Sequence, residues 1–529
     1  MPVSTSLSHQ PFHRGYFNGD GYTYNAYPEF FPLRMSLVSL LAGQRPPRLD
    51  QPFRLVDFGC GQGVGLCLQA ALHPHACFSG IDLLATHISH GRQLAAAAGL
   101  SNVSFQDADL VALARQDPTP QGPVAPAPGS VDLAICHGLL SWVSREVQQS
   151  IWTLASSCLR PGGLLAISYN AFPGNLSAVP FQHLVRSLQE SHEPGSASLE
   201  AALQLSQRLQ QCGAGVFSAQ PNLSSLLEEL PSRDPDYLPH EYNQQLWQPR
   251  FSDAVIRQAS SHGFSFLGTT SLAEAFEGLL PAAFRDLLAE QSDPARRQLL
   301  RDLLLNTSFR RDVYARGLDR LWPLDAQQAI GEIRLLRLIS DEQLERSNPQ
   351  ELFRFRLSFG SLQGNPDWFL SLLRALGHEP RCISELSRME GFASRPLPEL
   401  LQNLAMLIEQ GLISELPPPV DHGPSQRLNR VLAARIRAGA PYHHLAAPLI
   451  GSCISISDLD GIALASHLDG HRGEELVSAI ETNLRELNRE VIHNGRSLQA
   501  EERHAFLREQ ADRFERRTIP ELQRLGAVA

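Results

Sequence analysis

The stretch Leu55-Val-Asp-Phe-Gly-Cys-Gly-Gln-Gly63, followed by Gly80-Ile-Asp82, decides the fold of this chain. In the first segment apolar residues lead to an acid and then to a turn rich in glycine, which is how a buried parallel strand ends and a covering helix begins. In the second segment the apolar run 76–81 ends at Asp82. We therefore expect two neighbouring parallel strands whose carboxyl ends meet at a ligand site.

The spacing of the glycines argues against a dinucleotide ligand. A dinucleotide fingerprint places its third glycine three positions after the second, and here that position holds Val64, Leu66 or Leu68, depending on the starting pair. A carboxylate at Asp57 would also repel a pyrophosphate at the start of the next helix. The same carboxylate attracts a sulfonium that carries an ammonium group. The stretch therefore indicates S-adenosylmethionine as the cofactor, and an ordinary turn between strand and helix is the alternative.

Eight residues are the predicted cofactor contacts. Asp82 is placed to accept hydrogen bonds from both ribose hydroxyls. At the end of the third strand, Asp109 can accept from the adenine amino group, whereas we expect Asp107 to be a solvated loop acid. The full set is Asp57, Gly59, Gly61, Gly63, Asp82, Leu83, Asp109 and Leu110.

The composition is that of a large protein with several domains. The chain has 529 residues, of which 43% are hydrophobic, and no apolar run approaches the roughly 20 residues that span a bilayer. Its N-terminus has no basic region followed by an apolar one, so we expect a cytoplasmic protein that does not enter membranes. The eight cysteines form no CxxC pair, and the paired histidines lack cysteine or carboxylate partners. We predict no metal site.

The charged residues are unusual in kind. A formal net charge of −10 makes duplex nucleic acid an unfavourable substrate. The chain contains no lysine, so all 45 basic residues are arginine. A genome whose base composition favours arginine codons explains this simply. An enzyme that methylates lysine side chains would also avoid modifying itself in this way, and both explanations stay open.

Short apolar runs alternate with helical segments from 53 to 170, the pattern of a doubly wound parallel α/β sheet. The expected strands are 53–57, 77–82, 103–106, 131–136 and 164–168, with helices near 30–41, 62–72, 86–98 and 144–158. A helix at 251–262 and an apolar strand at 264–268 close this unit. The polar stretch 176–245 lies between the fifth strand and this helix. We therefore interpret it as a helical insertion beside the ligand crevice. The proline-rich segment 116–129 is expected to be an exposed loop.

The predicted domains follow from this pattern. They are an aromatic and helical lead at 1–48, the cofactor-binding domain at 49–275 with its insertion at 176–245, a helical regulatory or bridging region at 276–345, a winged-helix-like domain at 346–440 and a helical region at 441–529. Few arginines lie between 397 and 416, so we expect the winged-helix-like domain to dock protein or to pack, not to bind DNA.

An aromatic cluster precedes the first predicted helix. Tyr16, Phe17, Tyr22, Tyr24 and Tyr27 lie within twelve positions of one another. Such residues either cover a bound ligand as a lid or pack against the helix, and the sequence does not decide between the two.

Three residues are the predicted catalytic contacts. The fourth strand ends at His137 and the fifth at Tyr169 and Asn170, all at the edge where the methyl group would lie. Methyl transfer from a sulfonium depends mainly on positioning and desolvation. An amine acceptor must be neutral, which an apolar pocket promotes by lowering its pKa, or which His137 promotes as a base. The alternative is that His137 is structural and hydrogen-bonds the neighbouring turn.

Several motifs recur in a known family. They are Tyr27-Pro28 with Pro32, Val56-Asp-Phe-Gly-Cys-Gly61, Gly80-Ile-Asp82, His137-Gly-Leu-Leu-Ser-Trp-Val143, Ser168-Tyr-Asn-Ala-Phe-Pro-Gly174, Tyr237-Leu-Pro-His-Glu-Tyr242 and Phe309-Arg310. With these motifs, spread over about 1–320, the chain resembles bacterial methyltransferases that carry a methyltransferase regulatory domain. The studied branch is the rickettsial-type outer-membrane-protein lysine methyltransferases. The resemblance implies a Rossmann-like cofactor domain, S-adenosylmethionine, and regulatory and C-terminal modules.

We therefore expect a class I S-adenosylmethionine-dependent methyltransferase that acts on lysine side chains of a protein. A small-molecule methyltransferase that uses the insertion as a lid is one alternative. A non-catalytic cofactor-binding interaction module is the other. The expected partner is a protein substrate, not a nucleic acid or a membrane, and self-association as a homodimer stays open.

Overall fold

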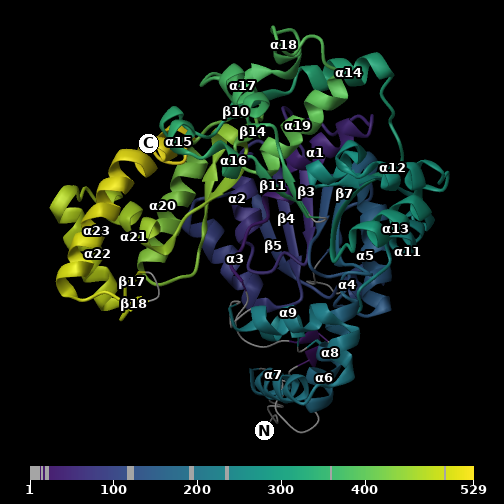
Figure 1. Cartoon of the computed structure of the whole chain (residues 1–529), viewed down its shortest axis with the longest axis horizontal. Coiled ribbons are helices and arrows are strands. Elements are labelled where there is room, and N and C mark those ends of the chain that lie inside the picture. Colours follow the sequence, from purple (N-terminus) through teal and green to yellow (C-terminus); the bar gives the residue numbers. More distant parts are fainter. Residues whose placement is uncertain are drawn as a thin grey trace.

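The computed structural model describes residues 12–13, 16–17, 23–115, 124–189, 196–232, 238–242, 244–357, 360–493 and 496–529. A seven-stranded sheet forms its centre, with helices on both faces (Figure 1). The strand order is β5-β4-β3-β6-β7-β9-β8. The strands are β3 (Arg54–Phe58), β4 (Cys77–Asp82), β5 (Val103–Asp107), β6 (Val131–Cys136), β7 (Leu159–Asn170), β8 (Phe264–Thr269) and β9 (Phe309–Arg316).

The sheet is parallel except at one strand. Strands β3 to β7 pair in parallel, and β9 pairs antiparallel with both β7 and β8. The predicted doubly wound sheet is confirmed. Strand β9 lies within the region 276–345 that the sequence predicts to be mostly helical. This strand carries charged residues, yet Val313, Tyr314 and Ala315 are fully buried in it. It enters the sheet because its apolar residues fill cores on both faces.

Helices cover the two faces of the sheet. On one face lie α1 (Pro32–Leu41), α2 (Val64–Leu72) and α3 (Ala85–Ala97), and on the other lie α4 (Leu110–Arg115), α5 (Arg145–Cys158), α11 (Ser252–Ser261) and α13 (Pro294–Leu305). Side chains alternate between these two cores along each strand. In β7, Leu164 and Ala166 join the first core and Leu165 and Ile167 join the second.

The segment after β7 folds into its own helical cluster beyond the carboxyl edge of the sheet (Figure 1, bottom). Its helices are α6 (Val179–Leu188), α7 (Ser196–Gln211), α8 (Gly215–Ala219), α9 (Pro221–Glu229) and α10 (Leu238–Tyr242). They occupy the stretch that the sequence predicts as an insertion. The predicted proline-rich loop at 116–129 lies outside the described residues up to position 123.

A second, smaller sheet follows the main one. Its order is β13-β10-β14, and its strands are β10 (Arg334–Arg337), β13 (Arg381–Cys382) and β14 (Ile413–Glu415). The same part of the chain holds a two-stranded sheet of β11 (Arg354–Leu357) and β12 (Gly360–Gln363), and the helices α14 (Pro323–Gly331), α15 (Asp341–Arg346), α16 (Pro349–Leu352), α17 (Pro366–Leu376), α18 (Ile383–Leu386) and α19 (Leu397–Glu409). Helix α12 (Ala282–Ala289) precedes β9 and packs against α13. The helix, strand, helix, helix, strand order of a winged unit is present. Its middle strand, however, is β10, which precedes the predicted boundary at 346.

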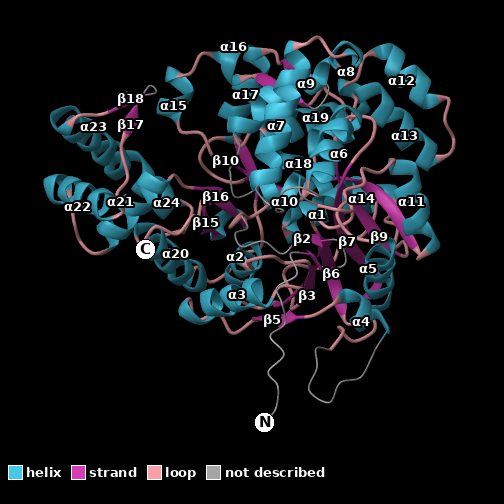
Figure 2. Ribbon diagram, turned by 90° about the horizontal axis from the view of Figure 1, so that it is seen from below, coloured by secondary structure: helices cyan, strands magenta, loops and turns pink. Residues whose placement is uncertain are grey.

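The C-terminal helices are α20 (Gly423–Arg437), α21 (Asp458–Leu468), α22 (Gly473–Glu486), α23 (Ala500–Arg513) and α24 (Ile519–Arg524), with short strands β15 (His444–Ala447), β16 (Ser452–Ser455), β17 (Ile492–His493) and β18 (Arg496–Ser497). Among these helices, α20 packs against α2 and α3, and α21, α22 and α23 follow in turn, each packed on the one before it (Figure 2). Leu428 and Leu432 of α20 share one core with α2, and the Ser425 hydroxyl donates to the Ala71 carbonyl at 3.1 Å. Within the described ranges, none of the helices has both the length and the apolar character needed to traverse a bilayer.

Candidate active site

Two small cavities lie side by side at the carboxyl ends of β3 to β6, and Gly59 lines both. The first has a volume of about 80 Å³ and is lined by residues that follow β4 and β5, among them Asp82, Leu83, Asp109 and Leu110. The second, of about 70 Å³, is lined by Asp57 and by the glycine turn with Gly61 and Gly63. The structure thus brings all eight predicted cofactor residues to one cleft.

In the turn between β3 and α2, Gly59, Gly61 and Gly63 all have positive φ. Gly59 has φ of 85° and Gly63 has φ of 74°, both in the left-handed region. A Cβ atom at Gly59 would lie 2.5 Å from Cδ1 of Leu139. The Gly59 amide donates to the Ile81 carbonyl at 2.7 Å, which ties the turn to the end of β4. The backbone can therefore approach a ligand here without a side chain between them.

Asp82 holds this turn in place. Its carboxylate accepts from the Gly61 amide and from the Leu84 amide, each at 2.9 Å, and lies 3.3 Å from Nδ1 of His87. The sequence predicts contacts with ribose hydroxyls and gives no hint of this local role. A carboxylate offers about four acceptor positions, so Asp82 can make these bonds and still accept from a ribose hydroxyl. The ribose contact stays a prediction.

Asp57 is the group that best fits a cationic ligand. It lies on β3 and lines the second cavity, and its Oδ1 has no hydrogen-bond partner among the described residues. Burial, and secondarily the nearby Asp82 carboxylate, raises the pKa of Asp57 from 3.8 to about 7. A buried carboxylate without a counter-charge is costly, and a sulfonium with its ammonium group would supply the missing positive charge.

The two acids at the end of β5 differ in exposure, and Asp107, predicted to be a loop acid, is the last residue of the strand. Asp109 lines the first cavity, and its Oδ1 accepts from the Val111 amide at 2.8 Å, which secures the first turn of α4. Asp107 lies 3.4 Å from Arg92, and both of these side chains are about half exposed. Asp107 is therefore a surface acid, and the adenine contact of Asp109 stays a prediction.

His137 lines the second cavity and is held by one hydrogen bond. The Ser168 hydroxyl accepts from the Gly138 amide at 2.9 Å and lies 2.8 Å from Nδ1 of His137. We assign the hydroxyl proton to this second contact, which leaves the ring proton on Nε2. Burial, with the Arg311 charge second, lowers the pKa of His137 to about 3. The ring is therefore neutral at physiological pH, and so low a pKa makes it a poor general base.

Aromatic rings surround His137. The ring centroids of Tyr27, Phe30 and Phe309 lie 3.9, 4.8 and 6.3 Å from the His137 ring. The Arg311 guanidinium lies 4.9 Å above the Phe309 ring and pairs with Glu29 at 3.0 Å. These residues form an apolar wall with one positive group at its edge. We call Tyr27, Phe30, Phe309 and His137 the aromatic wall.

The predicted aromatic cluster divides into two roles. Tyr27 lines the cavity, as a lid residue would. Tyr24 instead packs its ring at 5.0 Å from His90 and 5.4 Å from Tyr442. The Tyr16 and Phe17 side chains and the whole of Tyr22 lie outside the described residues.

The structure separates Tyr169 from His137, so the prediction that Tyr169 faces the acceptor is wrong. Its side chain is 1% exposed, and its hydroxyl donates to Asp312 at 2.8 Å in the core on the far face of the sheet. Side chains alternate along a strand, so Ser168 and Asn170 point to the face of His137 whereas Tyr169 does not. The backbone amide of Asn170 donates to the Ser141 hydroxyl at 2.9 Å. The contact of the Asn170 side chain with an acceptor stays a prediction.

Other lining residues were not singled out from the sequence. Among them are Asn25, Phe30, Gln62 and Gln69. Phe30 and Asn25 reach the cleft from the segment before α1, and nothing in their local pattern distinguishes a wall of a cleft from ordinary packing. Only the three-dimensional arrangement shows the difference.

Known proteins match this chain in sequence and in fold. A family model described as a methyltransferase domain matches residues 49–227, and one described as a predicted methyltransferase regulatory domain matches residues 234–316. The structure of PKMT2 from Rickettsia typhi in complex with AdoHcy covers 96% of this chain and 99% of its own, with a TM-score of 0.68 at 19% identity. The chain is a class I S-adenosylmethionine-dependent methyltransferase. Its cofactor is S-adenosylmethionine, as the glycine turn predicts.

Two curated proteins show how far the similarity to this methyltransferase extends. An uncharacterized protein of Synechocystis sp. is 27% identical over 522 residues, which is 97% of this chain and 99% of the other. A trans-aconitate 2-methyltransferase of Methylobacterium nodulans is 30% identical over 154 residues, which is 29% of this chain and 50% of the other. The first matches the whole chain and the second only part of it.

The regulatory match belongs structurally to the sheet of the methyltransferase. Residues 234–316 contain α11, β8 and β9, and these two strands complete the sheet beside β7. The sequence places the regulatory region later, at 276–345. The two ranges overlap at residues 276–316.

Proposed function

We propose that the methyltransferase transfers methyl groups to lysine side chains of an acceptor protein. The observation that carries this proposal is the full-length likeness to PKMT2, a neighbour of the lysine methyltransferase type. That likeness includes the modules after residue 320, whereas the relative that acts on trans-aconitate matches 29% of this chain. Modules beyond the cofactor domain are suited to engaging a large acceptor.

The aromatic wall suits an amine acceptor. When bound, S-adenosylmethionine supplies a methyl group on a positively charged sulfur, and an amine can attack it only in its neutral form. Tyr27, Phe30 and Phe309 keep water from this region, and desolvation lowers the pKa of an amine. His137, with its proton on Nε2, can donate a hydrogen bond that orients a group in the cavity.

The absence of lysine from the chain agrees with this acceptor. A lysine methyltransferase without lysine cannot consume its cofactor on itself. Codon bias explains the same composition, so this feature supports the proposal without deciding it. We propose the cytoplasm as the location, on the sequence features alone.

The proposal is tested by incubating the protein with methyl-labelled S-adenosylmethionine and a bacterial lysate, then separating protein, small molecules and nucleic acid. We expect the label in protein. The control is Asp57→Ala, which removes the buried carboxylate from the cofactor cleft, and with it the label should disappear. Label that enters only small molecules would overturn the proposal in favour of a small-molecule methyltransferase. Cofactor binding without transfer to any fraction would favour an interaction module.

A further inference from the structure

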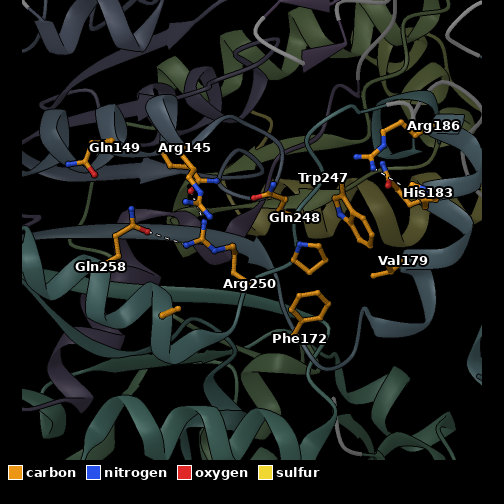
Figure 3. A pocket seen from close by; sticks show the side chains of 14 residues that line it. Arg145, Gln149, Phe172, Val179, His183, Arg186, Trp247, Gln248, Arg250 and Gln258 are labelled. Carbon is orange, nitrogen blue, oxygen red and sulfur yellow. Dashed lines mark hydrogen bonds between the residues drawn. The ribbon is translucent and has the colours of Figure 1, made fainter. Parts of the chain in front are cut away.

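A larger cavity lies outside the cofactor cleft, between α5, α6, α11 and the segment that leads to Arg250 (Figure 3). Its volume is about 830 Å³, roughly ten times that of either cofactor cavity. Among the described residues that line it are the three arginines Arg145, Arg186 and Arg250 and one histidine, His183, and none is acidic. We call this space the arginine cavity.

Within the part of the chain that the structure describes, no acid forms an ion pair with the arginines of this cavity. Arg250 donates to the amide oxygens of Gln148 at 2.6 Å and Gln258 at 3.4 Å, and Arg186 donates to the Gln245 carbonyl at 3.0 Å. All of these acceptors are uncharged. Burial, followed by the neighbouring Arg145 charge, lowers the pKa of Arg250 from its ordinary value, although a guanidinium stays charged.

The side chains face a common space. In Figure 3, Arg145 and Arg250 lie together on one side, and Arg186 lies on the other side, beyond Trp247. Trp247 and Phe172 add apolar surface between them. Helices α5, α6 and α11 each contribute one of their first three residues to the lining. The cavity therefore favours an anion that also carries apolar groups.

The cavity is joined to the catalytic cleft by short contacts. The Gln148 side chain donates to the carbonyls of Leu140 at 2.9 Å and Val143 at 3.1 Å, in the segment that follows His137. The Arg250 amide donates to the Asn170 carbonyl at 2.8 Å, at the end of β7. The lining of the arginine cavity is therefore bonded to the two segments that carry His137 and Asn170. An acceptor that occupies both sites must be larger than a small molecule, because the two sites share no lining residue.

We propose that the arginine cavity binds acidic side chains of the acceptor protein, so that the enzyme selects lysines within glutamate- or aspartate-rich segments. This inference rests on the proposed function and specifies its substrate class. Guanidinium groups pair with carboxylates by charge-assisted hydrogen bonds, often two at a time. A net charge of −10 disfavours a long polyanion such as nucleic acid, while a few carboxylates placed in one basic cavity avoid that repulsion.

The test uses the full-length enzyme and two fluorescent peptides, one with glutamates around a lysine and a matched one with glutamine at the same positions. We expect the acidic peptide to bind at least about tenfold more tightly in low salt, and the preference to shrink as salt is added. The double variant Arg145→Gln and Arg186→Gln should lose the preference. Arg285→Gln, which changes an exposed arginine on α12, should keep it.

Equal binding of the two peptides, or a preference that survives in the double variant, would overturn the inference. A further contrary result is that citrate or a single-stranded oligonucleotide displaces the fluorescent peptide at a lower concentration than the unlabelled acidic peptide needs. That result would also overturn the inference, because the cavity would then serve another anion. Methyl transfer is measured separately with the lysate. If no protein is labelled but the peptide preference is lost in the double variant, the proposed function fails and the acidic docking site stands.

Discussion

The Asp57 carboxylate couples cofactor binding to pH. Its pKa of about 7 in the cofactor-free protein means that it is ionised mainly above neutrality. Only the ionised form attracts a sulfonium, so the affinity for S-adenosylmethionine should fall about tenfold between about pH 8 and pH 6. Calorimetric titration at several pH values measures this. Asp57→Asn should bind weakly at every pH, whereas Asp107→Asn, a change at a surface acid, should follow the wild type.

The same residue predicts a stability effect of the opposite sign. The folded protein keeps a proton on Asp57 that the unfolded chain releases near 3.8. This group therefore makes the cofactor-free protein less stable as pH rises from about 4 to about 7. In thermal melts without cofactor, Asp57→Asn should raise the melting temperature at about pH 8 and change it little at about pH 4. An equal change at both pH values would show that the carboxyl is not desolvated.

His137 is expected to orient the acceptor, not to remove a proton. Because its pKa is about 3, its titration cannot appear in a rate profile between about pH 6 and pH 9. We expect His137→Asn to lower the rate of methyl transfer about tenfold to hundredfold, with cofactor affinity unchanged. A rate profile in which His137→Asn abolishes a wild-type step near neutrality would instead identify the ring as a base. Single-turnover rates on the labelled acceptor distinguish these results.

Among the strands, β9 carries a buried ionic network that joins it to α13. Arg310 lies 2.7 Å from Asp302 and 3.0 Å from Asp312, and all three side chains are nearly inaccessible. Removing one partner leaves uncompensated buried charge, which costs about 3–5 kcal/mol. Arg310→Met should therefore lower the melting temperature strongly. Arg311→Met, on the opposite face and paired with the partly exposed Glu29, should cost about 1 kcal/mol or less. Equal losses would contradict this assignment.

The sequence predicted those elements whose conformation is determined by neighbouring residues in the chain. The turn at Gly59 and the strand before it follow from nearby residues, and so does the placement of Asp82. Strand β9 could not be predicted because its Arg310 and Asp312 neutralise each other only after folding. Tyr169 was misplaced because a strand end was considered without the alternation of its side chains. The arginine cavity combines residues from segments that are distant in the sequence, so no single segment indicates it.

For the chain as a whole, one hydrogen-bonded path connects the C-terminal region to the cofactor turn. Arg435 donates to the Tyr442 hydroxyl at 2.9 Å, and this hydroxyl and Nε2 of His90 lie 2.6 Å apart. Nδ1 of His90 lies 2.6 Å from the Gln62 carbonyl. Burial lowers the pKa of His90, so the ring is neutral. We assign its proton to Nδ1, since a carbonyl can only accept, and Nε2 then accepts from Tyr442.

This path predicts that the C-terminal region tunes cofactor affinity. Tyr442→Phe removes one buried hydrogen bond, worth about 1 kcal/mol, and should weaken S-adenosylmethionine binding about three- to tenfold. Titration calorimetry measures the effect. Tyr314→Phe, which removes a hydroxyl bonded to Asp312 on the other face of the sheet, should leave cofactor affinity unchanged. Identical affinities for wild type and Tyr442→Phe would show that the path does not reach the turn.

The chemical identity of the methylated atom tests the central claim most directly. A lysate is incubated with S-adenosylmethionine that carries a deuterated methyl group, and the modified protein is digested and analysed by mass spectrometry. We predict deuterated methyl groups on the side-chain nitrogen of lysine, and none when the Asp57→Ala variant is used. Deuterium on arginine, on a carboxylate or only on small molecules would contradict the account.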